Sequence, residues 1–189
     1  MIKYILLGLI WAGFLAHWIW GSIPKRKTFE VFAGIGIGIC LTLLVFSLSG
    51  WFRTENPALL FQVFRWVGFV FYISAIVLCV ATLVTLKLKG VPESGIENTT
   101  RLAEIGLFHI VRHPLYLGLS LWSVGFILIL QNIVSVILGV LAIVSFWLAG
   151  KKEDAFNLRK FGPAYEDYMR RVPMWNVWKG MKDRFHERG

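Results

Sequence analysis

The feature that most limits the folds open to this chain is a series of long apolar runs. They span Ile2–Trp20, Phe29–Gly50, Pro57–Leu86, Leu115–Leu130 and Ile133–Ala149. A helix needs about 20 apolar residues to cross the hydrocarbon core of a bilayer, and the first three runs reach that length. Within lipid every backbone N–H and C=O must be paired, which a helix achieves by itself. We therefore predict an all-α integral membrane protein with about five transmembrane helices.

The last two runs are shorter and are joined only by Gln131-Asn132. So short a link permits a tight helical hairpin. Short helices can still cross where the bilayer thins or where flanking residues snorkel, and a re-entrant hairpin is the alternative. The composition agrees with a membrane protein, since 57% of the 189 residues are hydrophobic and 16% are charged. We expect one membrane domain: three helices in 1–86, a loop in 87–113, the hairpin and a further helical piece in 114–173, and an interfacial helical tail in 174–189.

Basic residues predict the orientation in the membrane. Lys25-Arg26-Lys27 follow the first run, four basic residues lie within 87–112, and the segment from Lys151 onward is also basic. Since cytoplasmic loops carry an excess of Lys and Arg, we expect the N-terminus outside and the C-terminus in the cytoplasm. The triplet at 25–27 also resists translocation, so the first run is interpreted as a retained anchor. The formal net charge of +9 then indicates membrane lipids as partners and not nucleic acid.

A polar cluster stands where the fourth run begins. Arg112-His113-Pro114 are followed by Tyr116. Proline is favoured at the first position of a helix and keeps the preceding residue extended, so Arg112 and His113 are expected on the approach to a helix. Helix N-termini attract anions, and a guanidinium can bind a carboxylate through two hydrogen bonds. The cluster predicts a site for a small anionic group at the membrane surface; a headgroup anchor and a helix cap are the structural alternative.

A second polar cluster, Glu153-Asp154, follows the fifth run. Neither Pro nor Gly interrupts Lys151–Phe161, so the helix is expected to continue until Gly162-Pro163 ends it. The hairpin should bring both clusters together. Their opposite charges fit a zwitterionic ligand that carries a carboxylate and an ammonium, while a simple Arg112–Glu153 ion pair is the alternative left open.

Two further segments flank these clusters. Lys87–Gly106 contains several Gly, Pro and polar residues, and predicts either a lid or a solvated connector. After Val172-Pro173, the tail carries Trp175 and Trp178 beside lysines. This combination predicts a tail that lies along the membrane interface with its aromatic side in lipid.

The two clusters resemble motifs of the isoprenylcysteine carboxyl methyltransferase family of integral membrane enzymes. The first motif is the run Gly106–Gly118. The second comprises Glu153-Asp154, Phe161-Gly162, Tyr165, Tyr168 and Val172-Pro173 at matching intervals. The resemblance covers Gly106 to Pro173, a little over a third of the chain.

This resemblance implies S-adenosylmethionine as methyl donor, with 114–173 as the catalytic hairpin and cofactor-binding segment on the cytoplasmic side. It implies catalytic roles for Arg112, His113 and Glu153. The residues that it implies at the cofactor are Arg112, His113, Tyr116, Gly118, Glu153 and Asp154. The acceptor would be lipophilic, such as an isoprenylcysteine-type carboxylate, an isoprenoid, a lipid or a thiol, and no metal is expected.

The chain departs from the family pattern at Ala149-Gly150, where an arginine is common, at Asp154, where a second glutamate is common, and in the segment before Gly106. An NADPH-dependent reductase of the sterol or steroid type, which has a related Arg-His motif, is a second interpretation. Such enzymes often place another residue where Pro114 stands, so the motif favours the methyltransferase. A non-catalytic membrane scaffold is the third.

Overall fold

The computed structural model describes residues 2–22, 27–50, 58–89 and 104–186, and all regular elements in these ranges are helical. The helices are α1 (Ile2–His17), which continues into a π-helical turn (Trp18–Ser22), α2 (Thr28–Leu48), α3 (Leu59–Lys89), a 3₁₀ turn (Gly106–His109), α4 (Pro114–Leu130), α5 (Ile133–Phe161), α6 (Pro163–Arg171) and α7 (Val177–His186). The all-α prediction is thereby confirmed for the described residues. The expected lid in Lys87–Gly106 falls mostly outside them.

Within the described residues, four helices are long and apolar enough to cross a membrane: α1 with its π-helical turn, α2, α3 and α5. The chain is therefore an integral membrane protein. The fifth apolar helix, α4, has 17 residues, which is at the lower end of the length that crosses a bilayer. Five crossings thus remain a prediction.

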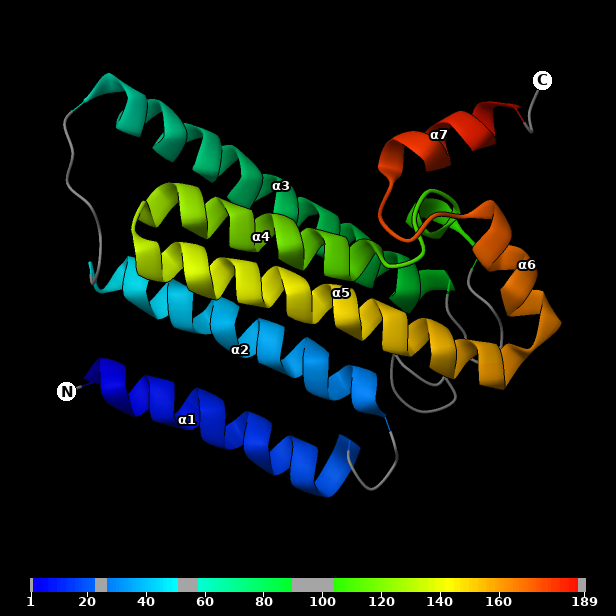
Figure 1. Cartoon of the computed structure of the whole chain (residues 1–189), viewed down its shortest axis with the longest axis horizontal. Coiled ribbons are helices and arrows are strands. Elements are labelled where there is room, and N and C mark those ends of the chain that lie inside the picture. The colour runs from blue at the N-terminus through cyan, green and yellow to red at the C-terminus, as the bar shows by residue number, and fades with distance from the viewer. Residues whose placement is uncertain (1, 23–26, 51–57, 90–103, 187–189) are drawn as a thin grey trace.

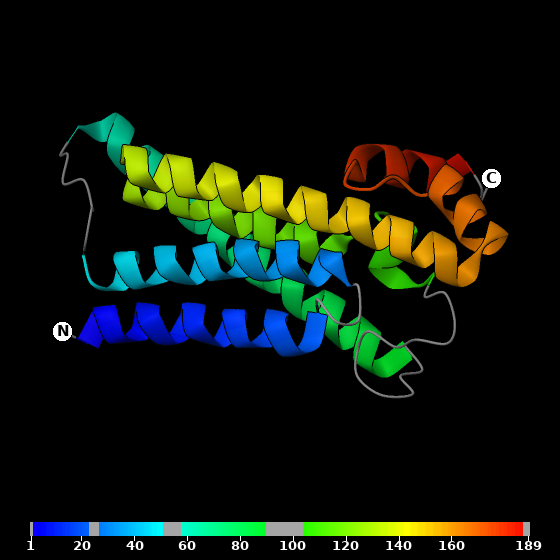
Figure 2. The ribbon, with the colours of Figure 1, turned by 60° about the horizontal axis from the view of Figure 1, so that its bottom comes forward.

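The long helices lie side by side in one bundle (Figures 1 and 2). α4 packs chiefly on α3 and α5 chiefly on α2, while α1 lies on the outer side of α2. Small residues allow the close approaches. A Cβ at Gly125 would lie 3.0 Å from the Gly68 carbonyl oxygen, and one at Gly36 would lie 2.5 Å from the Phe146 ring. Small residues therefore bring α4 close to α3, and α5 close to α2.

The turn between α4 and α5 consists of Gln131 and Asn132. Gln131 adopts a left-handed conformation with φ of 54°, and its side-chain amide donates to the carbonyls of Phe61 (2.7 Å) and Leu128 (2.8 Å). Asn132 Oδ1 accepts a hydrogen bond from the Ser135 amide at 2.9 Å and so caps α5. Side chains thus satisfy the backbone of this turn, and the two helices run back along each other.

α5 extends twelve residues beyond the predicted apolar run, to Phe161. Gly162 ends it with φ of 60°, and Pro163 begins α6. This extension carries Glu153 and Asp154, and it leads to α6 (Figure 1). α7 is inclined to the long helices in Figure 1, and an interfacial placement of the tail stays a prediction.

Candidate functional site

The site begins with a non-helical approach to α4, in which His113 has ψ of 65° and is less extended than the sequence predicted. His113 occupies the N-cap position with φ of −122°, and Pro114 is the first residue of the helix, as predicted. The Arg112 amide donates to the Pro173 carbonyl at 3.0 Å, and the His113 amide donates to that of Met174 at 3.5 Å. The backbone of the tail therefore pairs with the backbone of the Arg-His motif.

The Arg112 side chain is largely buried, and it links α5 to the end of α6. Its Nε and Nη2 donate to the two carboxylate oxygens of Asp154 at 3.3 and 2.9 Å. Its Nη1 donates to the carbonyls of Met169 (3.0 Å) and Val172 (2.6 Å). Four of the five guanidinium N–H groups are thus used within the protein. Arg112 fastens the end of α6 to α5, and at most one N–H is left for a ligand.

The acid that pairs with Arg112 is Asp154, and not Glu153 as in the ion pair considered from the sequence. Neighbouring residues on a helix point about 100° apart, so only one of the two acids can face Arg112. Asp154 is 5% exposed, and its Oδ1 also accepts from His113 Nε2 (2.8 Å) and from the Tyr165 hydroxyl (2.7 Å). Its buried carboxylate is therefore surrounded by donors, as a buried charge requires.

His113 connects this buried cluster to a cavity. The ring stacks on Tyr116, with centroids 5.6 Å apart, and its other nitrogen, Nδ1, lies 3.7 Å from Glu153 Oε2. The far side of the ring rests on α5, where a Cβ at Gly150 would lie 3.3 Å from His113 Cδ2. Glu153 is the more open acid, with 29% of its side chain exposed.

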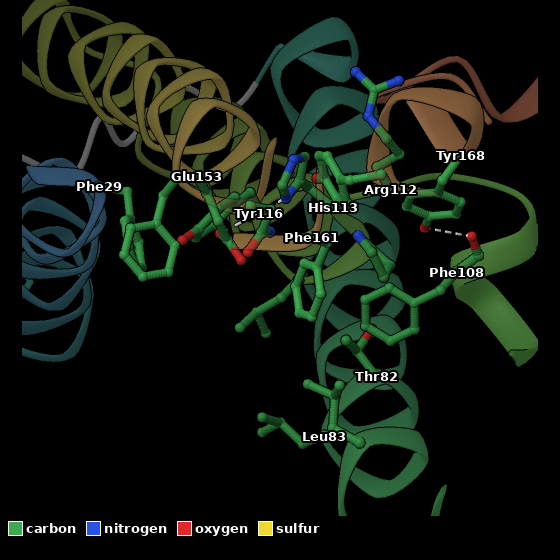
Figure 3. Close-up of a pocket in the computed structure, with 16 residues that line it drawn as sticks. Phe29, Thr82, Leu83, Phe108, Arg112, His113, Tyr116, Glu153, Phe161 and Tyr168 are labelled. Carbon is green, nitrogen blue, oxygen red and sulfur yellow. Dashed lines mark hydrogen bonds and ion pairs between the residues drawn. The ribbon is translucent and has the colours of Figure 1, made fainter. Parts of the chain in front are cut away.

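The cavity has a volume of about 330 Å³. It is lined by the polar residues Thr82, Arg112, His113, Glu153, Asn157, Tyr165 and Tyr168, and by Phe29, Leu83, Leu86, Phe108, Pro114, Leu115, Tyr116, Phe156 and Phe161. Figure 3 shows Glu153, His113 and Tyr116 together at one side of the cavity, with Leu83 and Thr82 on α3 at the other. The cavity thus joins a polar end to aromatic and aliphatic walls.

Two tyrosines of α6 hold the wall on the tail side. The Tyr168 hydroxyl donates to the Phe108 carbonyl at 2.7 Å (Figure 3), and so ties α6 to the 3₁₀ turn. Burial, and then the negative charge of Glu104, raise the pKa of Tyr168. Burial and then the charge of Asp154 raise the pKa of Tyr165. Both hydroxyls therefore stay protonated and act as hydrogen-bond donors.

The family resemblance implied six residues at the cofactor, and the structure places them in three different environments. His113, Tyr116, Glu153 and Arg112 line the cavity, while Asp154 is buried behind them. Gly118 faces α3, where a Cβ would lie 2.7 Å from Cys79 Sγ. In this structure Gly118 is thus a helix-packing position away from the cavity.

Six lining residues had no predicted role: Phe29, Thr82, Leu83, Leu86, Phe156 and Asn157. Asn157 follows Glu153 by four residues, so helical spacing could have placed it on the same face. Phe29 and Phe156, from α2 and α5, contact each other with ring centroids 5.3 Å apart. No motif in the sequence marks that pair, because it depends on how α2 and α5 pack.

The model of a protein family described as NnrU protein matches residues 26–180. The chain belongs to the NnrU family. The match includes every residue that lines the cavity. No solved structure matches the chain.

This NnrU-family chain is also similar to curated methyltransferases. The protein-S-isoprenylcysteine O-methyltransferase of Schizosaccharomyces pombe is 36% identical over 69 residues, which cover 36% of this chain and 29% of that protein. Protein-S-isoprenylcysteine O-methyltransferase B of Arabidopsis thaliana is 33% identical over 78 residues, 41% of this chain and 40% of the relative. The chain thus spans less than half the length of these relatives, and the predicted family resemblance is confirmed.

Proposed function

We propose that this chain transfers a methyl group from S-adenosylmethionine to a lipophilic acceptor. The observation that carries the proposal is the polar end of the cavity, where His113 Nδ1 and Glu153 Oε2 lie 3.7 Å apart beside aromatic walls. Two neighbouring acceptors favour a ligand that brings N–H donors between them. An ammonium group, such as that of the methionine part of the donor, meets this requirement.

The chain's own residues would orient the donor. Glu153 and His113 would accept hydrogen bonds from the ammonium, and the Tyr116 ring, which stacks on His113 with centroids 5.6 Å apart, would keep the imidazole in place. The start of α4 opens on the cavity at Pro114 and Leu115, and the partial positive charge of a helix N-terminus favours a carboxylate there. Four of the five guanidinium N–H groups of Arg112 already bind Asp154 and the backbone at the end of α6. Arg112 would therefore hold the cavity wall in place and contribute little to binding this carboxylate.

The reaction would be an in-line displacement. S-adenosylmethionine supplies a methyl group on a positively charged sulfur; as the acceptor's lone pair bonds to the methyl carbon, the C–S bond breaks and its electron pair stays on sulfur. Alignment is the main requirement. An ionised carboxylate acceptor needs no base, whereas a neutral thiol or amine would also have to give up its proton.

The apolar part of the cavity, with Phe29 from α2 and Leu83 from α3, fits the hydrocarbon part of an acceptor. The relatives' names specify an isoprenylcysteine, and we propose an acceptor of this general kind. The positive-inside pattern supports a reaction at the cytoplasmic face. Residues 114–173 would then form the catalytic hairpin and donor-binding segment.

The experiment uses the full chain in lipid nanodiscs, labelled S-adenosylmethionine, and prenylcysteine, free isoprenoid, phospholipid and thiol acceptors. We expect transfer to at least one acceptor, and roughly tenfold or greater loss of donor affinity in Glu153→Gln, because a charge-assisted hydrogen bond is removed. Glu166→Gln is the matched control, since Glu166 is exposed and pairs with Arg170 on the surface of α6.

Two results would contradict the proposal. Thermal stabilisation by NADPH and none by S-adenosylmethionine would favour the reductase. Stabilisation by neither, together with no transfer to any acceptor, would favour a scaffold.

A further inference from the structure

The hydrogen bonds behind the cavity form a continuous chain centred on Asp154. Its carboxylate accepts from three side chains that come from two parts of the fold: Arg112 and His113 just before α4, and Tyr165 on α6. The Tyr165 hydroxyl in turn interacts with the Asn157 side chain, which lines the cavity. Only one of these interactions, that of His113, reaches the proposed ligand position directly.

We propose that Tyr165 is a positioning residue that acts through Asp154 to hold His113 with Nδ1 towards Glu153 and the cavity. The inference rests on the proposed function for its catalytic meaning, but the orientation of His113 can be measured without any substrate. Tyr165 is 2% exposed, and it comes from α6, whose only helical neighbour with extensive contacts is α5 among the described elements.

The first step of the argument concerns the proton on His113. Asp154 receives two N–H groups of the Arg112 guanidinium, which favours its ionised form. An ionised carboxylate only accepts hydrogen bonds, so His113 Nε2, 2.8 Å away, must carry a proton. In the neutral ring Nδ1 is then an acceptor. The hydrogen bond at one nitrogen thus determines what the other nitrogen offers to a ligand.

The second step concerns the position of the carboxylate. Tyr165 donates to Oδ1, the oxygen that His113 also uses, at 2.7 Å. This hydroxyl stays protonated because burial and the charge of Asp154 disfavour its ionised form. Without the Tyr165 hydroxyl, Asp154 Oδ1 would still accept hydrogen bonds from His113 Nε2 and, at the longer distance of 3.3 Å, from Arg112 Nε. The carboxylate would then have one strong restraint fewer against rotation about its side chain.

The test compares Tyr165→Phe with Tyr168→Phe. Both changes remove one buried hydroxyl from α6, but the Tyr168 hydroxyl donates to the Phe108 carbonyl and not to Asp154. Each keeps the aromatic ring and every charge of the cluster. Comparing the two variants therefore distinguishes the general effect of losing a buried hydrogen bond on α6 from the specific effect of losing the hydrogen bond to Asp154.

The measurement is nitrogen-15 NMR of histidine-labelled full-length protein in detergent, with the His113 signals assigned through His113→Asn. We expect a protonated Nε2 and a non-protonated Nδ1 in the neutral ring. The Nε2–H signal should move in Tyr165→Phe and keep its position in Tyr168→Phe. A signal that is unmoved in Tyr165→Phe, or moved equally in both variants, would overturn the proposal.

The second readout is methyl transfer. We expect the turnover rate to fall about fivefold in Tyr165→Phe, the loss of about one hydrogen bond, with a smaller change in donor affinity, and to fall less in Tyr168→Phe. If the His113 signal moves in Tyr165→Phe but the unsubstituted protein transfers methyl to no acceptor, the positioning role of Tyr165 stands and the proposed function is contradicted. Transfer that is equally fast in wild type and Tyr165→Phe would contradict the positioning role alone.

Discussion

At the scale of single residues, the adjacent acids Glu153 and Asp154 have different environments and, we propose, different roles. The Asp154 carboxylate is enclosed by Arg112, His113 and Tyr165. The Glu153 carboxylate lines the cavity and is partly exposed. Because a buried ion pair is costly to break on one side only, Asp154 should matter most for stability and Glu153 for binding.

This difference predicts that two isosteric substitutions reduce the free energy of unfolding by different amounts. Asp154→Asn leaves the buried Arg112 guanidinium without its counter-charge, and should destabilise the protein by about 3–5 kcal/mol. Glu153→Gln should change stability by less than about 1 kcal/mol, because its side chain is partly solvated. Thermal unfolding in the same detergent measures both. Equal melting temperatures for the two variants would contradict the assignment.

At the scale of the elements, the tail is held against the bundle by close contacts that involve glycine. Gly150 of α5 lies beneath both the His113 ring and the Met174 side chain. Gly180 of α7 approaches the Ile110 carbonyl so closely that a Cβ would overlap it. Met174 makes the contact with Gly150 and also accepts the backbone hydrogen bond from the His113 amide. The docking of the tail and the placement of His113 therefore depend on each other.

Gly150→Ala tests this dependence. The added methyl would displace the flexible end of the Met174 side chain and press on the His113 ring at 3.3 Å, so we expect a loss of about 1 kcal/mol of stability together with weaker donor binding. Gly13→Ala is the matched control, because nothing lies within 4 Å of a Cβ there. Thermal unfolding and titration with S-adenosylmethionine measure the two effects. If Gly150→Ala is destabilised but binds S-adenosylmethionine with unchanged affinity, the docking of the tail does not affect the site, and the expected dependence is wrong.

At the scale of the whole molecule, the cavity lies between the long helices and α6. Its walls come from α2, α3, α4, α5 and α6. The turn at Gln131-Asn132 lies at the opposite end of the bundle. If α4 and α5 both cross the membrane, this turn and the site face different compartments.

Cysteine labelling tests this arrangement. Asn132→Cys, at the turn, and Asn176→Cys, before α7, are treated in intact cells with a membrane-impermeant maleimide. We expect labelling of the first from outside and of the second only after lysis, with unsubstituted protein as the background control for Cys40 and Cys79. Labelling of both from the same side would indicate a re-entrant hairpin.

Much of the architecture could be predicted from residue patterns alone. Apolar length predicted membrane helices, and Pro114 and Gly162-Pro163 predicted where α4 begins and α5 ends, since these features act locally on the backbone. The partner of Arg112 was not predictable in this way. Glu153 and Asp154 are equally close to it in sequence, and the choice depends on the rotation of α5 about its own axis.

The sequence by itself therefore determined that this is a helical membrane protein of a methyltransferase-like family, with two polar motifs in the C-terminal half. Apolar length, helix-terminating residues and motif spacing are properties of short segments, so they need no tertiary information. Only the tertiary structure decided that Arg112 clamps α6 to α5, that Gly118 is a packing position and that Phe29 from α2 completes the cavity. These depend on how helices distant in sequence rotate and pack against one another, which burial and close contact determine in three dimensions.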